Sequence, residues 1–155
     1  MKPFLDIVTT VSAGLMIGTE LAVWVFVNPI LNRLDDPSRT VAIRLFAQKL
    51  GAAMPVWYGL NFALLVAAAV LQRRAAGEPL LIAAGAIWAA VIVLTLIFLV
   101  PINNEIANLV ARDGSAMTPD AFRRSHRIWD LRHRWRVGAL GAALVCIAAA
   151  LCSGS

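Results

Sequence analysis

Four long apolar runs alternate with polar, charged segments along the chain. The runs cover residues 4–27, 52–71, 80–100 and 133–152. The first three reach the roughly 20 residues that a helix needs to cross a bilayer. The fourth reaches that length only when Trp135 and His133 are counted at or inside the membrane boundary. We therefore expect an all-α protein, a four-transmembrane-helix bundle that forms a single domain over residues 1–155.

The segments between the runs, residues 28–51 and 103–132, are charged and amphipathic. Within the second, Thr118, Pro119 and Asp120 have the residue types of an N-cap, a first-turn proline and a first-turn acid. A helix that begins at Pro119 can continue unbroken into the last apolar run. Its length would exceed the thickness of a bilayer, so its first half should stand outside the membrane.

The first and third runs end in similar sequences. Residues 29–32 read Pro-Ile-Leu-Asn, and residues 101–104 read Pro-Ile-Asn-Asn. Each is followed by a charged connection and another apolar run. Two interpretations stay open: a pair of repeated helical hairpins related by an axis normal to the membrane, or two helix ends that happen to be alike.

Composition excludes a soluble protein. Hydrophobic residues make up 60% of the chain, charged residues 15%, and the mean hydropathy is +0.76, whereas soluble domains average about 45–50% apolar and about 25% charged. The net charge of +5 does not indicate a nucleic-acid partner, because the basic residues flank the apolar runs. The expected partners are the lipid bilayer and a small hydrophobic substrate.

The basic residues predict an orientation. Eleven lie in the two long connections and three lie elsewhere, so the positive-inside rule places those connections in the cytoplasm and both termini outside. We expect a multi-pass protein of a bacterial inner membrane. The eleven are Arg33, Arg39, Arg44, Lys49, Arg112, Arg123, Arg124, Arg127, Arg132, Arg134 and Arg136, and the three are Lys2, Arg73 and Arg74.

Glu20 and Asn61 are polar residues within apolar runs and are candidates for function. Ionisable groups in a membrane are costly and usually mark sites. Glu20 and Asn61 each lie about 10 Å inside the cytoplasmic ends of their runs. Glu20 could alternatively be a structural carboxyl paired with an arginine. We expect Glu20, Asn61, Asn104 and His133 to line one cavity that opens towards the cytoplasm.

The last helix presents a second set. His126, Asp130 and His133 fall within about 60° of arc on one face, and Trp129 flanks that face. With Glu20 or Glu105 they could bind a non-haem iron or a zinc ion. Alternatively, His133 could act as a general base without any cofactor. A structural reading is a helix that faces lipid headgroups, where His, Trp and Arg are common.

Three aromatic residues, Trp24, Trp57 and Tyr58, are expected at the depth of this site. An interfacial aromatic belt is the favoured interpretation for them, with substrate contact as the alternative for Trp57. The candidate catalytic residues are His133, Glu20 and Asp130. The candidate substrate-binding residues are Asn61, Asn104, Arg136, Trp129 and Trp57. The candidate metal ligands are His126, Asp130, His133 and Glu105.

Three sequence features together resemble one protein family. The first run ends in Asn28-Pro29, the third ends in residues 101–105 (Pro-Ile-Asn-Asn-Glu), and Trp129, His133 and Arg136 precede the last run. These resemble the anthrone oxygenase-like family of small four-helix membrane proteins. The resemblance implies oxidation of a phenolic polyketide, such as an anthrone, to a quinone with O₂, often without an added cofactor.

By the same resemblance, His133 would be the base, and Asn104 and Arg136 would stabilise the substrate anion. The alternative class is a non-catalytic membrane protein, either a small-molecule carrier or an accessory subunit. No phosphate-binding glycine loop, nucleotide fingerprint or haem motif occurs in the chain.

Overall fold

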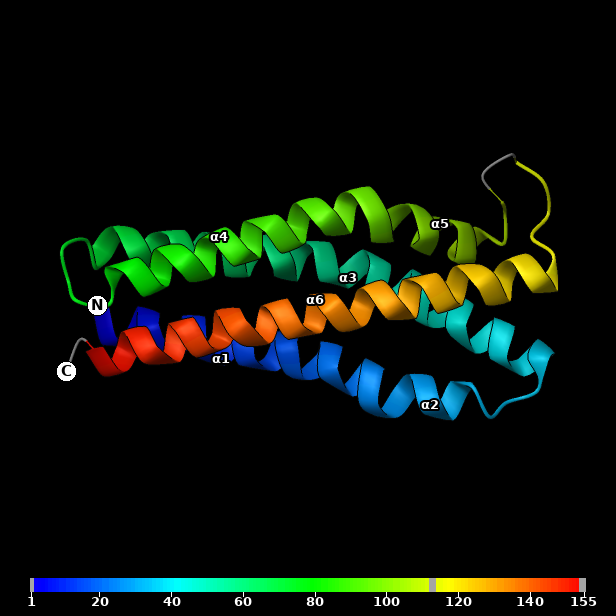
Figure 1. Ribbon diagram of the computed structural model, residues 1–155, viewed down its shortest axis with the longest axis horizontal. Helices are drawn as coiled ribbons and strands as arrows, with labels where there is room; N and C mark the ends of the chain where they lie inside the picture. Colours follow the sequence, from blue (N-terminus) through cyan, green and yellow to red (C-terminus); the bar gives the residue numbers. More distant parts are fainter. Residues whose placement is uncertain (1, 112–113, 154–155) are drawn as a thin grey trace.

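Four long helical rods lie side by side in the computed structural model, which describes residues 2–111 and 114–153 (Figure 1). The side chain of Lys2 and all of Arg112, both counted above, lie outside the described residues. Each rod is long and apolar enough to cross a membrane: Pro3–Leu31, Asp36–Leu71, Glu78–Asn108 and Pro119–Ser153. The predicted all-α, four-helix architecture of a multi-pass membrane protein is therefore confirmed.

The first and third rods share an irregularity that the sequence did not predict. The first consists of α1 (Lys2–Ala22), a π-helical turn η1 (Val23–Val27) and α2 (Asn28–Leu31). The third consists of α4 (Glu78–Leu94), η2 (Thr95–Leu99) and α5 (Val100–Asn108). Both π-helical turns end two residues before a proline. Because π-helical turns are rare, their occurrence at the same place favours the repeated-hairpin interpretation over chance similarity.

The second and fourth rods are α3 (Asp36–Leu71) and α6 (Pro119–Ser153), each recorded as one α-helix. α6 begins at the proline that the sequence indicated. At the start of α3, the side chain and main-chain N–H of Ser38 lower the pKa of the Asp35 carboxyl below its usual range. The charged segments ahead of the second and fourth runs are thus largely helical extensions of the spans.

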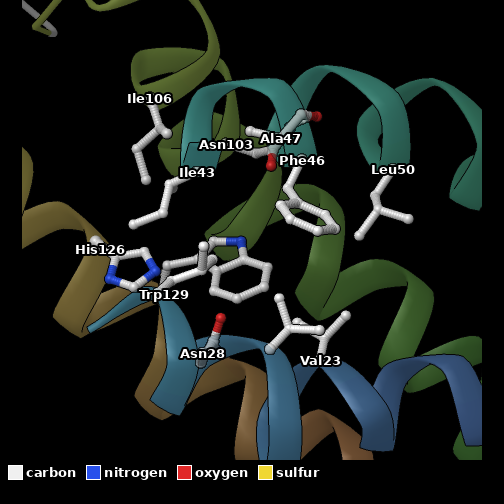
Figure 2. A pocket seen from close by; sticks show the side chains of 12 residues that line it. Val23, Asn28, Ile43, Phe46, Ala47, Leu50, Asn103, Ile106, His126 and Trp129 are labelled. Atoms are coloured by element: carbon white, nitrogen blue, oxygen red, sulfur yellow. Dashed lines mark hydrogen bonds between the residues drawn. The ribbon is translucent and has the colours of Figure 1, made fainter. Parts of the chain in front are cut away.

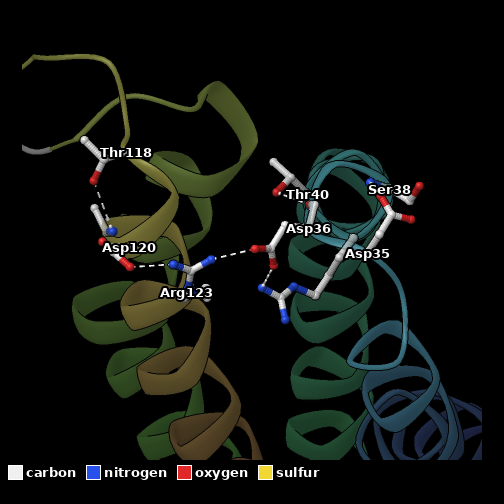
Figure 3. A network of polar contacts seen from close by, with 9 residues as sticks. Asp35, Asp36, Ser38, Thr40, Thr118, Asp120 and Arg123 are labelled. Carbon is white, nitrogen blue, oxygen red and sulfur yellow. Dashed lines mark hydrogen bonds and ion pairs between the residues drawn. The ribbon is translucent and has the colours of Figure 1, made fainter.

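Both termini lie at the same end of the molecule as the short connection between α3 and α4 (Figure 1). The opposite end carries the α2–α3 and α5–α6 connections and is called the connection end below. There Arg123 on α6 pairs with Asp36 on α3 at 2.7 Å and with Asp120 at 2.5 Å (Figure 3). All three side chains are exposed, so solvent screens both pairs and they add little to stability.

The core of the bundle is apolar through its middle and tight at the opposite end. Met16, Leu65, Trp88 and Leu140 are fully buried and belong to one cluster. At Gly77, which precedes α4, an added Cβ would lie 2.6 Å from the carbonyl oxygen of Ala150. Only a glycine allows this close approach. The space left between the rods lies towards the connection end.

Candidate functional site

Glu20 is the centre of a buried polar cluster. It lies in the last turn of α1 and is 2% exposed. The hydroxyl of Tyr58 donates to Glu20 Oε1 at 2.9 Å, and Nη2 of Arg136 donates to Oε2 at 2.6 Å. A charge in the membrane interior is costly without a partner, so these two donors stabilise the carboxylate at this depth.

His133 completes the cluster and uses both ring nitrogens within it. Nε2 lies 3.0 Å from the main-chain oxygen of Glu20, while Nδ1 lies 3.1 Å from Glu20 Oε2 and 3.0 Å from Arg136 Nη2. A neutral ring with its hydrogen on Nε2 donates to that carbonyl and accepts from Arg136 at Nδ1. A ring protonated at Nδ1 can instead donate to the carboxylate. A proton can therefore be held on either side of the Nδ1–Oε2 contact.

Local helix geometry explains why these groups meet. His133 and Arg136 are three residues apart on α6 and so share one face. The carbonyl of Glu20 lies in the turn before η1, where the hydrogen-bond ladder changes from α to π spacing. The same relation occurs at the second π-helical turn, because Nη1 of Arg132 donates to the carbonyl oxygen of Phe98 in η2 at 2.9 Å. Side chains of α6 thus donate to main-chain carbonyls at or beside both irregular turns.

A cavity of about 410 Å³ lies beside the cluster. Its wall includes Glu20, Tyr58, His133 and Arg136, and Asn104 lies on its exposed side. Much of the remaining wall is apolar. The volume lies within the roughly 300–1,000 Å³ of small-molecule sites, which typically combine an apolar lining with a few convergent polar groups.

Three of the four residues expected to share a cavity do so, namely Glu20, Asn104 and His133. The structure does not place Asn61 among the residues that line this cavity. Its Nδ2 donates to the carbonyl of Trp57 at 2.9 Å and lies 3.6 Å from the sulfur of Met16. Asn61 faces α1, and its position on α3 is turned away from the cavity.

Trp57 is also not among the lining residues. Its Nε1 donates to the hydroxyl of Ser12 at 3.1 Å, again towards α1. The alternative of substrate contact for Trp57 is therefore not carried into the proposal below. Trp24, expected in the same belt, lies beside the charged Arg134, whose guanidinium carbon is 6.0 Å from the indole centre.

The four predicted metal ligands do not form one coordination site. Asp130 faces α2 and accepts from Nδ2 of Asn28 at 2.6 Å, and Glu105 accepts from the hydroxyl of Ser125 at 3.4 Å. Among the described residues, no group of three or more His, Cys, Asp or Glu side chains has an arrangement that could hold a metal ion. Sharing one helix face was not sufficient, because neighbouring helices and side chains separate these groups.

Trp129 accounts for the separation of the two imidazoles. Its ring is stacked on His133 at 4.7 Å and on His126 at 6.3 Å between centres, with nearly parallel planes. His126 lies instead at a smaller apolar pocket of about 50 Å³, where the indole occupies the middle of the lining side chains (Figure 2). Trp129 lines both this pocket and the larger cavity. It therefore remains a candidate substrate-binding residue.

Tyr58 is the site residue that sequence reasoning missed. The belt interpretation is wrong for it, because Tyr58 is 5% exposed and bonded to Glu20. The guanidinium of Arg136 lies 5.6 Å from its ring centre. A signal was present in the sequence: Tyr58 precedes the buried Asn61 by three residues, so both lie on the inner side of α3.

A family profile described as anthrone oxygenase matches residues 43–146. The chain belongs to the anthrone oxygenase family. This confirms the resemblance noted from the sequence. The part matched to the anthrone oxygenase profile runs from within α3 to within α6, so it contains Tyr58, His133 and Arg136, whereas Glu20 precedes it. Neither a curated protein nor a solved structure matches the chain.

Proposed function

We propose that this chain is a membrane-embedded oxygenase that oxidises a small hydrophobic phenolic or polyketide-type substrate, such as an anthrone, with O₂. Family membership supports oxygenase-like activity. The observation that carries the proposal is the Glu20–His133–Arg136 cluster on the wall of an otherwise mostly apolar cavity. An apolar cavity suits a tricyclic substrate, and the cluster supplies a base and a cation.

The base in this proposal is the Glu20–His133 pair, with Glu20 in contact with the substrate. Both nitrogens of His133 are bonded within the cluster, so a direct contact with substrate would require one of those bonds to open. A carboxylate has about four acceptor positions; Tyr58 and Arg136 occupy two, and Nδ1 of the neutral His133 ring carries no hydrogen, so Glu20 keeps a free position towards the substrate. Glu20 takes the acidic ring CH proton, and His133 can hold that proton at Nδ1, 3.1 Å away.

Oxidation then proceeds on the substrate. The carbanion left by proton removal is delocalised onto the ring oxygen, and the charge of Arg136 stabilises it, with Asn104 on the exposed side of the cavity. The carbanion transfers electrons to O₂, a C–O bond forms, and the resulting peroxide takes back the proton. Loss of the second CH proton with cleavage of the O–O bond gives the quinone carbonyl and water. One O₂ is consumed, with one oxygen atom in each product.

Oxygen uptake tests this proposal. The full chain, purified in lipid nanodiscs, is given 1,8-dihydroxyanthrone, and O₂ consumption and quinone formation are followed together. We expect one O₂ per quinone at a rate proportional to protein and well above the protein-free rate. Binding without O₂ consumption would contradict the oxygenase and favour the alternative of a carrier.

We further propose the orientation that the basic residues predict, with the connection end in the cytoplasm. A cysteine is placed at Ser38, close to the start of α3, in a chain whose Cys146 and Cys152 are replaced by Ala. In intact cells an impermeant maleimide should leave it unlabelled, and cell lysis should expose it. Labelling before lysis would reverse the orientation and place the cavity near the outer face.

A further inference from the structure

The exposed lining residues show where the large cavity opens. On α3 they are Gly51, Pro55 and Gly59, and on the third rod they are Leu96 and Asn104. Glu20 of α1 and His133 of α6, which also line the cavity, are buried. The opening is therefore a slot between α3 on one side and η2 with α5 on the other. We call it the α3–α5 slot.

Both edges of the α3–α5 slot have an interrupted backbone. Pro55 has no N–H, so the α3 hydrogen bond to the carbonyl of Gly51 is missing. The facing edge contains the π-helical turn η2 and then Pro101. In a membrane, irregular backbone is tolerated where it is buried in protein or lines a cavity. Both interruptions line the cavity, with Pro55 of α3 and Leu96 of η2 among its exposed residues.

Side-chain hydrogen bonds close the slot at its two ends. Nδ2 of Asn103 on α5 donates to the carbonyl of Ala47 at 3.1 Å, and Nε1 of Trp88 on α4 donates to the carbonyl of Tyr58 at 3.2 Å. The first bond lies on the connection side of the slot and the second on the other side. The second and third rods are thus hydrogen-bonded to each other on both sides of the opening between them.

The depth of the slot decides what it faces. Pro55 and Gly59 lie within the apolar run 52–71, and Leu96 lies within the run 80–100. Only the Asn104 end reaches the level of the polar connections. At this depth the surrounding medium is the hydrocarbon of the bilayer, so a molecule passing through the slot comes from the lipid.

We propose that the cavity receives its substrate sideways from the bilayer through the α3–α5 slot, and that the substrate is a flat, lipid-dissolved aromatic molecule. Gly59 leaves one edge without a side chain, and an added Cβ there would meet no atom within 4 Å, whereas the side chain of Asn103 fills the space at Gly51. The nature of the substrate rests on the proposed function, whereas the route rests on the slot. A planar ring system enters edge-on with its apolar faces against the helices and reaches Glu20 on the far wall.

The test places a bulky side chain in the slot. Gly59→Leu is compared with Gly18→Leu, because Gly18 is also exposed and also has no atom within 4 Å of an added Cβ, but does not line the cavity. Vesicles of phosphatidylcholine and phosphatidylglycerol loaded with 1,8-dihydroxyanthraquinone are mixed with protein in nanodiscs. Quenching of tryptophan fluorescence reports the association rate, since Trp129 lies at the cavity wall.

We expect Gly59→Leu to lower the association rate about tenfold or more, because entry then requires the helices to move apart, while Gly18→Leu keeps the wild-type rate. The dissociation rate should fall with it. A wild-type association rate in Gly59→Leu, or no binding of the probe by the wild-type chain, would overturn the inference. Because the assay needs no turnover, binding without O₂ consumption would contradict the proposed function alone.

A second form of the test avoids any effect on folding. Gly59→Cys and Gly18→Cys are made in the chain with Cys146 and Cys152 replaced by Ala, and each is modified with N-phenylmaleimide after purification. Modification at position 59 should slow association of the probe, and modification at position 18 should not. Equal association rates before and after modification at position 59 would place the entry elsewhere.

Discussion

Replacement Glu20→Gln is expected to lower the turnover number for quinone formation by about 10²–10⁴-fold, the usual contribution of a positioned general base. Glutamine keeps the size of the side chain; its amide oxygen can still accept from Arg136, and its NH₂ can donate to the hydroxyl of Tyr58. It cannot take the proton from the substrate. The measurement is initial O₂ uptake with 1,8-dihydroxyanthrone at saturating concentration, on protein that elutes as the wild type does.

The matched control is Asp6→Asn. Asp6 is the other acid of the first apolar run and likewise accepts a hydrogen bond, from Nε2 of Gln72, the residue that follows α3, at 2.6 Å. It lies near the opposite end of the bundle from the cavity, so Asp6→Asn should retain wild-type turnover. Equal turnover by Glu20→Gln and the wild type would show that Glu20 is not the base.

Replacement Arg136→Met is expected to destabilise the protein by about 3–5 kcal/mol, because it leaves the Glu20 carboxylate buried without its cation. Methionine roughly preserves the apolar length of the side chain. The side chains of the pair are 11% and 3% exposed, so water can replace little of the lost interaction. The measurement is unfolding of the purified protein in detergent, followed by circular dichroism against temperature or denaturant.

The double replacement Glu20→Gln with Arg136→Met measures how much the two side chains stabilise each other. Because the buried charge is removed together with its partner, the double variant should regain much of the stability that Arg136→Met loses. Its turnover should stay at the level of Glu20→Gln. Strictly additive losses of stability would show that the two side chains are not energetically coupled and that their 2.6 Å contact is not formed.

The four spans were predictable because they depend on the length and the hydrophobicity of each run, which can be read directly from the sequence. A run of about 20 apolar residues is not stable when exposed to water. In lipid, a helix satisfies the hydrogen-bonding groups of its backbone. The π-helical turns were not predictable. Both turns, Val23–Val27 and Thr95–Leu99, have an ordinary apolar composition. Only the structure shows that main-chain carbonyls at or beside these turns accept hydrogen bonds from side chains of α6.

The charged centre of the site was partly predictable from the same reasoning. Glu20 needed a partner at its own depth, and the short last run kept His133 and Arg136 close to that depth. What the sequence did not determine was rotation about each helix. On α3, Tyr58 faces the cavity while Trp57 and Asn61 face α1, and a small rotation, set by packing against α1 and α4, decides between them.

The structure does not bring the predicted metal ligands together among the described residues, for a related reason. Placing His126, Asp130 and His133 on one face of α6 was sound helix geometry, but it ignored what fills the space between them. Trp129 stacks on both imidazoles, and Asn28 of α2 hydrogen-bonds the carboxyl of Asp130. The contacts of a side chain with other helices cannot be read from periodicity along its own helix.

An oxygenase site at Glu20 and His133 is tested most directly by the fate of ¹⁸O₂. The wild-type chain in nanodiscs is given 1,8-dihydroxyanthrone under ¹⁸O₂, with Glu20→Gln and protein-free nanodiscs alongside, and the quinone is analysed by mass spectrometry at early times. The proposed reaction predicts one ¹⁸O atom in the new carbonyl, formed in proportion to wild-type protein and at close to the protein-free rate in Glu20→Gln. Unlabelled quinone, or labelled quinone formed no faster with the wild type than without protein, would contradict it.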